Sequence, residues 1–149
     1  MSNPVFLVDH VGVGTVVVDG DEGRHAATVR RLRVGETVDL SDGVGSRGTG
    51  VVTAVTKTTI DVDIADVTTE PAAAPEFIVV QAIAKGDRAE MAVEILTELG
   101  ASRIVPWAAS RSIGKLDADK GLAKWQRIAR EAAKQSRRAW VPVVEQSHS

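Results

Sequence analysis

Residues 77–107 read FIVVQAIAKGDRAEMAVEILTELGASRIVPW, and this stretch decides the fold of the second half of the chain. It opens with the apolar run FIVVQAIA, which is typical of a parallel strand covered on both faces. Helical spacing follows over 88–99, and we expect Gly100 to end that helix. RIVPW (103–107) then reads as a second strand. Strand, helix and strand in this order predict an α/β sheet with right-handed crossovers.

The two predicted helices of this half each have an apolar stripe that should face the sheet. We expect Asp87 and Glu90 to cap the first helix. Its inward side chains are expected to be Met91, Ala92, Ile95, Leu96 and Leu99. The second helix should be capped by Asp117 or Asp119 and end near Arg138. Its inward side chains are expected to be Leu122, Trp125, Ile128, Ala129 and Ala132. With WVPVV (140–144) as a short last strand, this half is an incomplete α/β domain.

The first half has a different pattern, with short β-branched strands separated by turns. PVFLVDH (4–10) and GTVVVDG (14–20) read as the first strands. ETVDLSDGVGSRGTGVVTAV (36–55) reads as a hairpin with its turn at Asp42-Gly43. TIDVDIAD (59–66) alternates strictly, so Ile60, Val62 and Ile64 should share one face and Asp61 and Asp63 the other. Residues 22–32 have helical spacing, with Ala26, Val29 and Leu32 inward. Several short antiparallel strands and one helix predict a small β-barrel.

A proline-rich segment separates the two halves. In TTEPAAAPE (68–76), Pro71 and Pro75 flank three alanines, which suits an extended linker. We therefore predict a barrel over 1–69, a linker over 70–76 and an α/β unit over 77–149.

Composition excludes several classes of function. The 149 residues are 44% hydrophobic and 26% charged, as in ordinary globular proteins. With no cysteine, the chain has neither disulfides nor a thiolate nucleophile. No apolar run is long enough to span a membrane and no signal peptide is visible, so we expect a cytoplasmic protein. His10, His25 and His148 are scattered and no phosphate-loop motif occurs, so we predict no metal site and assign no catalytic residue.

Positive charge is concentrated in two segments of a chain whose net charge is only −2. RHAATVRRLRVG (24–35) holds four arginines in a first half (1–70) with six basic and eleven acidic residues. Residues 111–138 hold nine basic and three acidic residues. From spacing alone, each segment is either a solvated helix face or a surface that binds RNA phosphates.

Three stretches carry a resemblance to a known family. RHAATVRRLRVGETVDLSDG (24–43), QAIAKGDRAEMAVEILTELGASRIVPWAASRS (81–112) and KWQRIAREAAKQSRRAWVPVV (124–144) resemble, in this order, the RsmE-type methyltransferases that modify uracil N3 in small-subunit ribosomal RNA. The resemblance implies a PUA-like barrel that holds RNA and a SPOUT-type α/β domain whose knot binds S-adenosylmethionine. It also implies a homodimer of the full-length protein.

The chain departs from the family pattern in two places. Asn3-Pro4-Val5 stands where many members have an arginine in the first strand. The family's glycine-rich GPEGG-like loop and its knot segment have no counterpart. We therefore expect the chain to be the front portion of a longer enzyme, without the knot and without cofactor-binding residues. On this interpretation the fragment alone neither binds S-adenosylmethionine tightly nor methylates RNA.

The resemblance and the positions along the chain together indicate a set of RNA contacts. Lys85 follows the first strand of the predicted sheet, and Arg111 and Ser112 follow the second, where open sheets bind ligands. The predicted RNA-binding residues are Arg24, Arg31, Arg33, Lys85, Arg111, Arg127, Gln135 and Arg138. Two alternatives remain open: a non-catalytic RNA-binding module, and an α/β domain that binds a protein partner.

Overall fold

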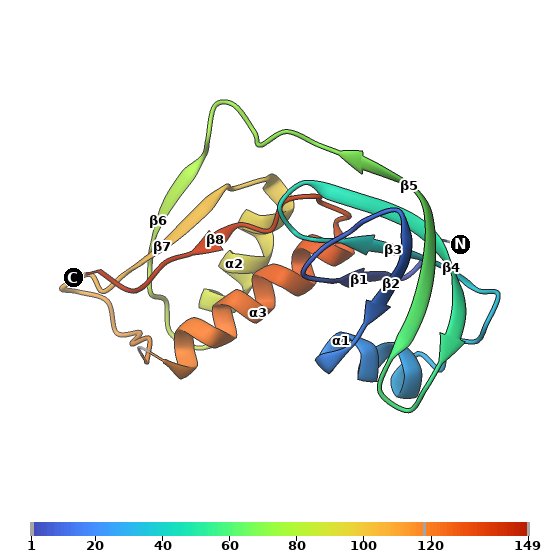
Figure 1. Cartoon of the computed structure of the whole chain (residues 1–149). Helices are drawn as coiled ribbons and strands as arrows, with labels where there is room; N and C mark the ends of the chain where they lie inside the picture. Colours follow the sequence, from blue (N-terminus) through green and yellow to red (C-terminus); the bar gives the residue numbers. More distant parts are fainter. Residues whose placement is uncertain (1, 118, 149) are drawn as a thin grey trace. The chain divides into compact units, whose positions relative to one another are not determined.

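The computed structural model describes residues 2–117 and 119–148 (Figure 1). These residues form two compact units, one ending at Pro71 and one beginning at Ala72. The division lies within residues 70–76, where the sequence places the linker. No helix among the described residues is long and apolar enough to cross a membrane.

The first unit is a five-stranded sheet with the order β1-β3-β4-β5-β2. β1 pairs in parallel with β3, and the other neighbours are antiparallel. The strands are β1 (Val5–Leu7), β2 (Gly14–Val18), β3 (Thr37–Ser41), β4 (Ser46–Val55) and β5 (Ile60–Thr69). The predicted hairpin at Asp42-Gly43 is confirmed, since it joins β3 to β4. This largely antiparallel sheet fits a barrel-type unit.

The strict alternation predicted for β5 is confirmed. Ile60, Val62 and Ile64 are buried in the core of the first unit, while Asp63 is exposed. β4 packs against this strand through Gly50, where an added Cβ would lie only 2.5 Å from the carbonyl oxygen of Asp63. A residue without a side chain is therefore required where β4 changes register against β5.

The helical segment of the first unit differs from the prediction. α1 (Gly20–Arg24) continues directly into a π-helical turn, η1 (His25–Val29). Ala26 is buried as expected, but Val29 is 67% exposed, so its predicted inward position is wrong. The turn is closed by a bond from the Arg30 N–H to the His25 carbonyl, five residues back. This wider turn rotates Val29 away from the face that an α-helix would give it.

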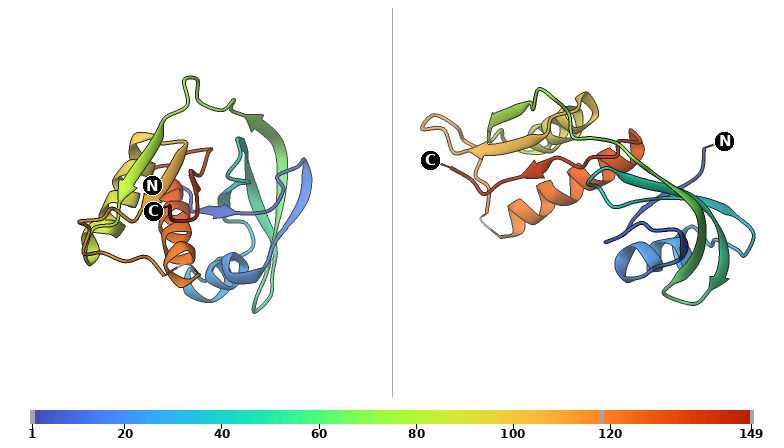
Figure 2. Two further views of the ribbon diagram at one scale, coloured as in Figure 1. Left: turned by 90° about the vertical axis from the view of Figure 1, so that its left-hand side faces the viewer. Right: turned by 45° about the horizontal axis from the view of Figure 1, so that its top comes forward.

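The second unit has three parallel strands in the order β6-β7-β8 and two helices (Figure 2). Its elements are β6 (Ile78–Ala82), α2 (Asp87–Leu99), β7 (Arg103–Trp107), α3 (Lys120–Gln135) and β8 (Val143–Val144). Right-handed crossovers between strands in sequential order place both helices on the same side of the sheet. The prediction that β6 is covered on both faces is therefore wrong for the described residues, since Ile78 and Val80 are 52% and 61% exposed.

The apolar stripe predicted for α2 is also wrong in part. The helix buries Ala89, Val93 and Thr97, whereas Met91, Ile95 and Leu99 are exposed. Two apolar rows run along α2, and within each row the residues are four positions apart. The neighbouring α3 and the sheet bury the row that has the smaller side chains. Thr97 can be buried because its hydroxyl donates to the Val93 carbonyl at 2.8 Å.

The predictions for the ends of the two helices are confirmed in part. Gly100 ends α2 in the left-handed conformation with φ 93, as predicted. The N-cap of α2 is Gly86 and not Asp87, which is the first helical residue. Of the two candidate caps of α3, the Asp117 carboxylate makes the contacts: it accepts the N–H groups of Asp119 and Lys120 at 3.1 and 2.8 Å. α3 ends at Gln135, three residues before the predicted end, and Trp125 is buried on its inner face as expected.

Candidate nucleic-acid interface

The arginine segment of the first unit lies on its surface. Arg24, Arg31 and Arg33 are all exposed, and so is Arg30, which the prediction did not include. The Arg24 guanidinium lies 3.8 Å from the Asp21 carboxylate, an exposed pair that contributes little. The segment therefore presents its guanidinium groups to solvent, where they can reach phosphates.

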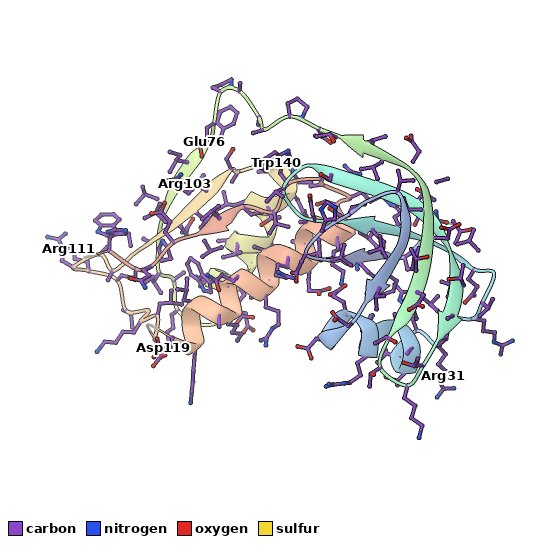
Figure 3. The ribbon with its side chains drawn as sticks, in the orientation of Figure 1. Arg31, Glu76, Arg103, Arg111, Asp119 and Trp140 are labelled. Carbon is purple, nitrogen blue, oxygen red and sulfur yellow. The ribbon has the colours of Figure 1, made fainter. Side chains whose placement is uncertain are left out.

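Arg31 has an unusual backbone conformation for its residue type. It follows η1 with φ 54, in the left-handed region that favours glycine (Figure 3). A side chain with a Cβ is strained there. A strained side chain of this kind is a candidate for a functional role.

The predicted residues of the second unit lie at two different edges of the sheet. Lys85 follows β6 and Arg111 follows β7, so both lie beyond the carboxyl ends of the strands, and Arg111 is exposed. Gln135 is the last residue of α3 and Arg138 lies between α3 and β8, so both lie near the edge where the strands begin. The Arg138 guanidinium lies against Gly100 at the end of α2. The structure therefore does not bring Arg138 into one cleft with Lys85 and Arg111.

The outer face of α3 is basic, as the sequence suggests. Arg127, Arg130 and Gln135 are exposed, while Trp125 and Ala129 face the core. Lys124 pairs with Glu90 of α2, so its charge is compensated. Arg127 and Arg130 are thus exposed basic side chains of this helix.

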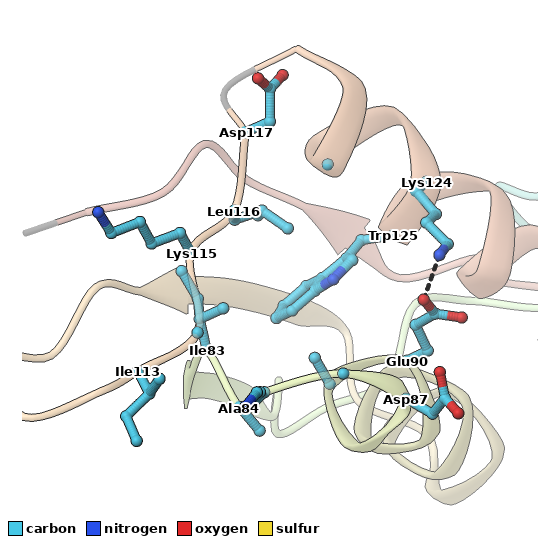
Figure 4. A pocket seen from close by; sticks show the side chains of 15 residues that line it. Ile83, Ala84, Asp87, Glu90, Ile113, Lys115, Leu116, Asp117, Lys124 and Trp125 are labelled. Carbon is cyan, nitrogen blue, oxygen red and sulfur yellow. Dashed lines mark ion pairs between the residues drawn. The ribbon is translucent and has the colours of Figure 1, made fainter.

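A pocket lies at the carboxyl end of β6 (Figure 4). Its volume is about 520 Å³, within the usual range for small-molecule sites. The lining comes from the end of β6, the start of α2, the loop 113–117 and the start of α3. Lys85, Asp87, Glu90, Lys115, Asp117 and Lys124 are its charged residues.

Of the RNA contacts predicted from the sequence, only Lys85 lines this pocket. Lys115 was counted among the basic residues of 111–138 but was not assigned a role. A signal was available in the sequence, because Gly114 and Lys115 follow the second strand of an open sheet, where ligands bind. The path of the loop 113–117 across the end of β6 could not be read from local spacing.

Two family models match the chain. One describes an RNA methyltransferase domain and matches residues 71–149, and the other describes an RNA methyltransferase PUA domain and matches residues 18–65. The chain is 44% identical over 146 residues to ribosomal RNA small subunit methyltransferase E of Mycobacterium tuberculosis, covering 95% of this chain and 56% of that protein. The Bacillus subtilis protein of the same name is 32% identical over 139 residues, covering 91% and 54%.

A solved structure shows the same fold. The ribosomal RNA small subunit methyltransferase E of Neisseria gonorrhoeae, bound to S-adenosylmethionine, matches with a TM-score of 0.87 and 31% identity. The match covers 99% of this chain and 62% of that one. The chain thus spans little more than half the length of the curated relatives it matches.

Proposed function

The chain belongs to the RNA methyltransferase family, with RsmE-type relatives, and from this premise we propose that it forms the RNA-holding part of an S-adenosylmethionine-dependent methyltransferase acting on uracil N3 of small-subunit ribosomal RNA. The observation that carries the proposal is the match of the RNA methyltransferase domain model to residues 71–149. The exposed arginine segment of the first unit supports it, because that unit matches a PUA domain model. A ribosomal RNA substrate would place this activity in the cytoplasm.

Seven basic residues and one glutamine are proposed to bind and position RNA. Arginine forks form bidentate bonds to phosphate, the usual geometry of backbone contacts to nucleic acid. We assign this role to Arg24, Arg31, Arg33, Lys85, Arg111, Arg127, Gln135 and Arg138. Methylation at N3 replaces a proton, so a base is required as well as positioning. Arginine cannot serve as that base because it stays protonated.

We propose that the described residues do not by themselves hold S-adenosylmethionine. The pocket at the end of β6 has one large aromatic ring, Trp125, and only 2% of this residue is exposed. Its indole is therefore packed in the core and does not offer a face to an adenine ring. We propose that S-adenosylmethionine is the methyl donor of the whole enzyme and is held in a SPOUT-type knot outside the described residues. We also propose that the whole enzyme is a homodimer.

RNA binding by this chain is tested by its salt dependence. A labelled transcript of small-subunit ribosomal RNA is titrated with the chain at several salt concentrations. Phosphate contacts should lower log K with a slope of about 0.7–0.9 per contact against log salt. The triple replacement of Arg24, Arg31 and Arg33 by alanine should weaken binding and reduce the slope, while Lys57→Ala serves as an exposed single-charge control in the same unit.

The two alternatives predict other results. Salt-independent binding, or no RNA binding, would favour an α/β domain that recognises a protein partner. The catalytic part of the proposal is tested by mass spectrometry of small-subunit RNA from cells lacking the full-length gene. Unchanged uracil methylation in those cells, with intact RNA binding by the chain, would support a non-catalytic RNA-binding module.

A further inference from the structure

One side of α2 carries a row of apolar side chains that stay exposed in the described part of the chain. Met91, Ile95 and Leu99 are four residues apart along the helix, and we call them the outer row. They are 57%, 46% and 78% exposed. The opposite side of the helix packs against α3 and the sheet through Ala89 and Val93. The outer row is therefore a second apolar surface of α2, of the kind that marks an interaction site.

Two charged residues beside the outer row are placed against the helix dipole. Arg88 is the second residue of α2 and Glu98 is the last but one. A helix carries partial positive charge at its N-terminus and partial negative charge at its C-terminus, so both placements are unfavourable. Both side chains are exposed, and neither forms an ion pair with another described residue. Neither charge is therefore neutralised by a contact within these residues.

The outer row and its two charges are complementary to a second copy of themselves. In an antiparallel pair of α2 helices with a two-fold axis level with Val93, residues equally far from Val93 in opposite directions would meet. Met91 would lie level with the partner's Ile95, and Arg88 level with the partner's Glu98. A parallel pair would instead place like charges side by side. The charges therefore select the antiparallel arrangement, in which each charge also faces the oppositely charged end of the other helix.

The length of α2 limits how strong such a contact can be. The helix has 13 residues and is therefore about 20 Å long. One helix face of this length buries less than the roughly 800 Å² per partner of a standard interface. We therefore expect a dimer that dissociates on dilution.

We propose that two copies of this chain associate through the outer row of α2, with Met91 and Ile95 at the centre of the interface and an ion pair between Arg88 and Glu98 at each end. Both members of each contact lie on the same surface, so the partner that fits is a second copy of the chain. This inference rests on the proposed function in one respect, since it assigns the homodimer proposed for the whole enzyme to a surface that this chain contains.

The test is sedimentation equilibrium of the purified, RNA-free chain over a wide range of concentrations. The unmodified chain should change from monomer to dimer as the concentration rises. Ile95→Asp should stay monomeric throughout, because the dimer would have to bury an unpaired carboxylate in the middle of the outer row. An unmodified chain that stays monomeric at every concentration would overturn the inference, whether or not another protein binds the outer row.

Charge reversal tests the pairing of Arg88 with Glu98. Arg88→Glu and Glu98→Arg should each weaken the dimer by about tenfold or more, because each brings like charges together at both ends of the interface. An equimolar mixture of the two variants should regain the affinity, since each introduced charge then meets an opposite charge on the other copy. Glu94→Arg is the matched control, because Glu94 is an exposed acidic residue of the same helix outside the outer row. An equal loss in this control, or no recovery in the mixture, would overturn the inference.

The open face of the sheet is the competing surface for self-association. Val80 of β6 is 61% exposed, and Val80→Asp should leave the dimer intact. Association that is lost in Val80→Asp but kept in Ile95→Asp would assign the contact to the sheet and overturn the inference. Both positions are exposed, and circular dichroism of each variant checks that the fold is retained.

Failure of this inference is distinguishable from failure of the proposed function, because the RNA titration and the sedimentation experiment are independent. A chain that binds the small-subunit RNA transcript but stays monomeric retains the proposed RNA-holding role and lacks this interface. A chain that forms the dimer but does not bind the transcript retains the interface and contradicts the proposed function.

Discussion

Replacing Arg31 by glycine should stabilise the first unit and at the same time weaken its binding to RNA. Arg31 has φ 54, where a residue with a Cβ costs about 1–2 kcal/mol. Glycine loses more conformational entropy on folding than arginine, and this loss offsets about 0.5–1 kcal/mol of the strain that is relieved. The expected net gain in the free energy of unfolding is about 0.5–1 kcal/mol, which corresponds to a rise in Tm of roughly 2–8 °C for a unit of this size.

The neighbouring residue provides the matched control. Arg30 is also exposed and carries the same charge, but its φ of −74 and ψ of −24 are ordinary helical values. Arg30→Gly should therefore destabilise the unit by about 0.5–1 kcal/mol. The two variants should shift stability in opposite directions, while both lose one positive charge from the arginine segment.

The assay combines thermal unfolding, followed by circular dichroism, with fluorescence anisotropy on a labelled ribosomal RNA transcript. A lower Tm for Arg31→Gly than for the unmodified chain would refute the argument from backbone strain. Unchanged RNA affinity in Arg31→Gly would refute the assignment of this side chain to RNA. Asn tolerates the left-handed region better than most residues, so Arg31→Asn provides a second variant that removes the charge there.

Three further outcomes are expected, each measured by unfolding of the purified chain. Gly50→Ala should destabilise the first unit by more than about 2 kcal/mol, because its Cβ would lie 2.5 Å from the Asp63 carbonyl oxygen; a change below 0.5 kcal/mol would contradict the close approach. Trp125→Ala should cost the second unit about 3–5 kcal/mol, and an unchanged transition would show that its burial is unimportant. Burial by itself would raise the pKa of Asp42, but the N–H groups of Val44 and Ser46, both at 2.9 Å, hold it below the ordinary value of 3.8. The stability that ionised Asp42 contributes is therefore complete above its unfolded pKa and is lost as the pH falls through the folded pKa. Asp42→Asn should remove this acid-dependent loss of stability. An unaltered dependence of unfolding on acid pH in this variant would contradict the assignment.

Local patterns predicted the elements well and the buried faces less well. The alternation of Ile60, Val62 and Ile64 and the helix end at Gly100 are confirmed, because both follow from backbone geometry within a few residues. Val29 was misplaced, since nothing in its spacing reveals that the chain there forms a π-helical turn. The inward position predicted for Leu99 is also wrong. The helix α2 has two apolar rows, and the spacing does not show which of them is buried.

The candidate site was predicted in part. Clustering of arginine over 24–33 and of basic residues over 111–138 identified surfaces that the structure shows to be largely exposed. Lys85 was correctly placed beyond the end of a strand, because the carboxyl ends of parallel strands share one edge. Arg138, predicted as a contact of the same RNA, lies at the opposite edge, because α3 returns the chain there before β8.

Local sequence patterns predict the order of strands and helices, the division between a β-rich and an α/β half, and the two basic segments. These properties depend on side-chain periodicity and charge, which are local along the chain. The choice of the buried row of α2, and the way in which the loop 113–117 meets β6 to form a pocket, follow from packing between elements. Both depend on contacts between residues distant in sequence, such as Gly114 against the Ile83 carbonyl, and no local pattern specifies these.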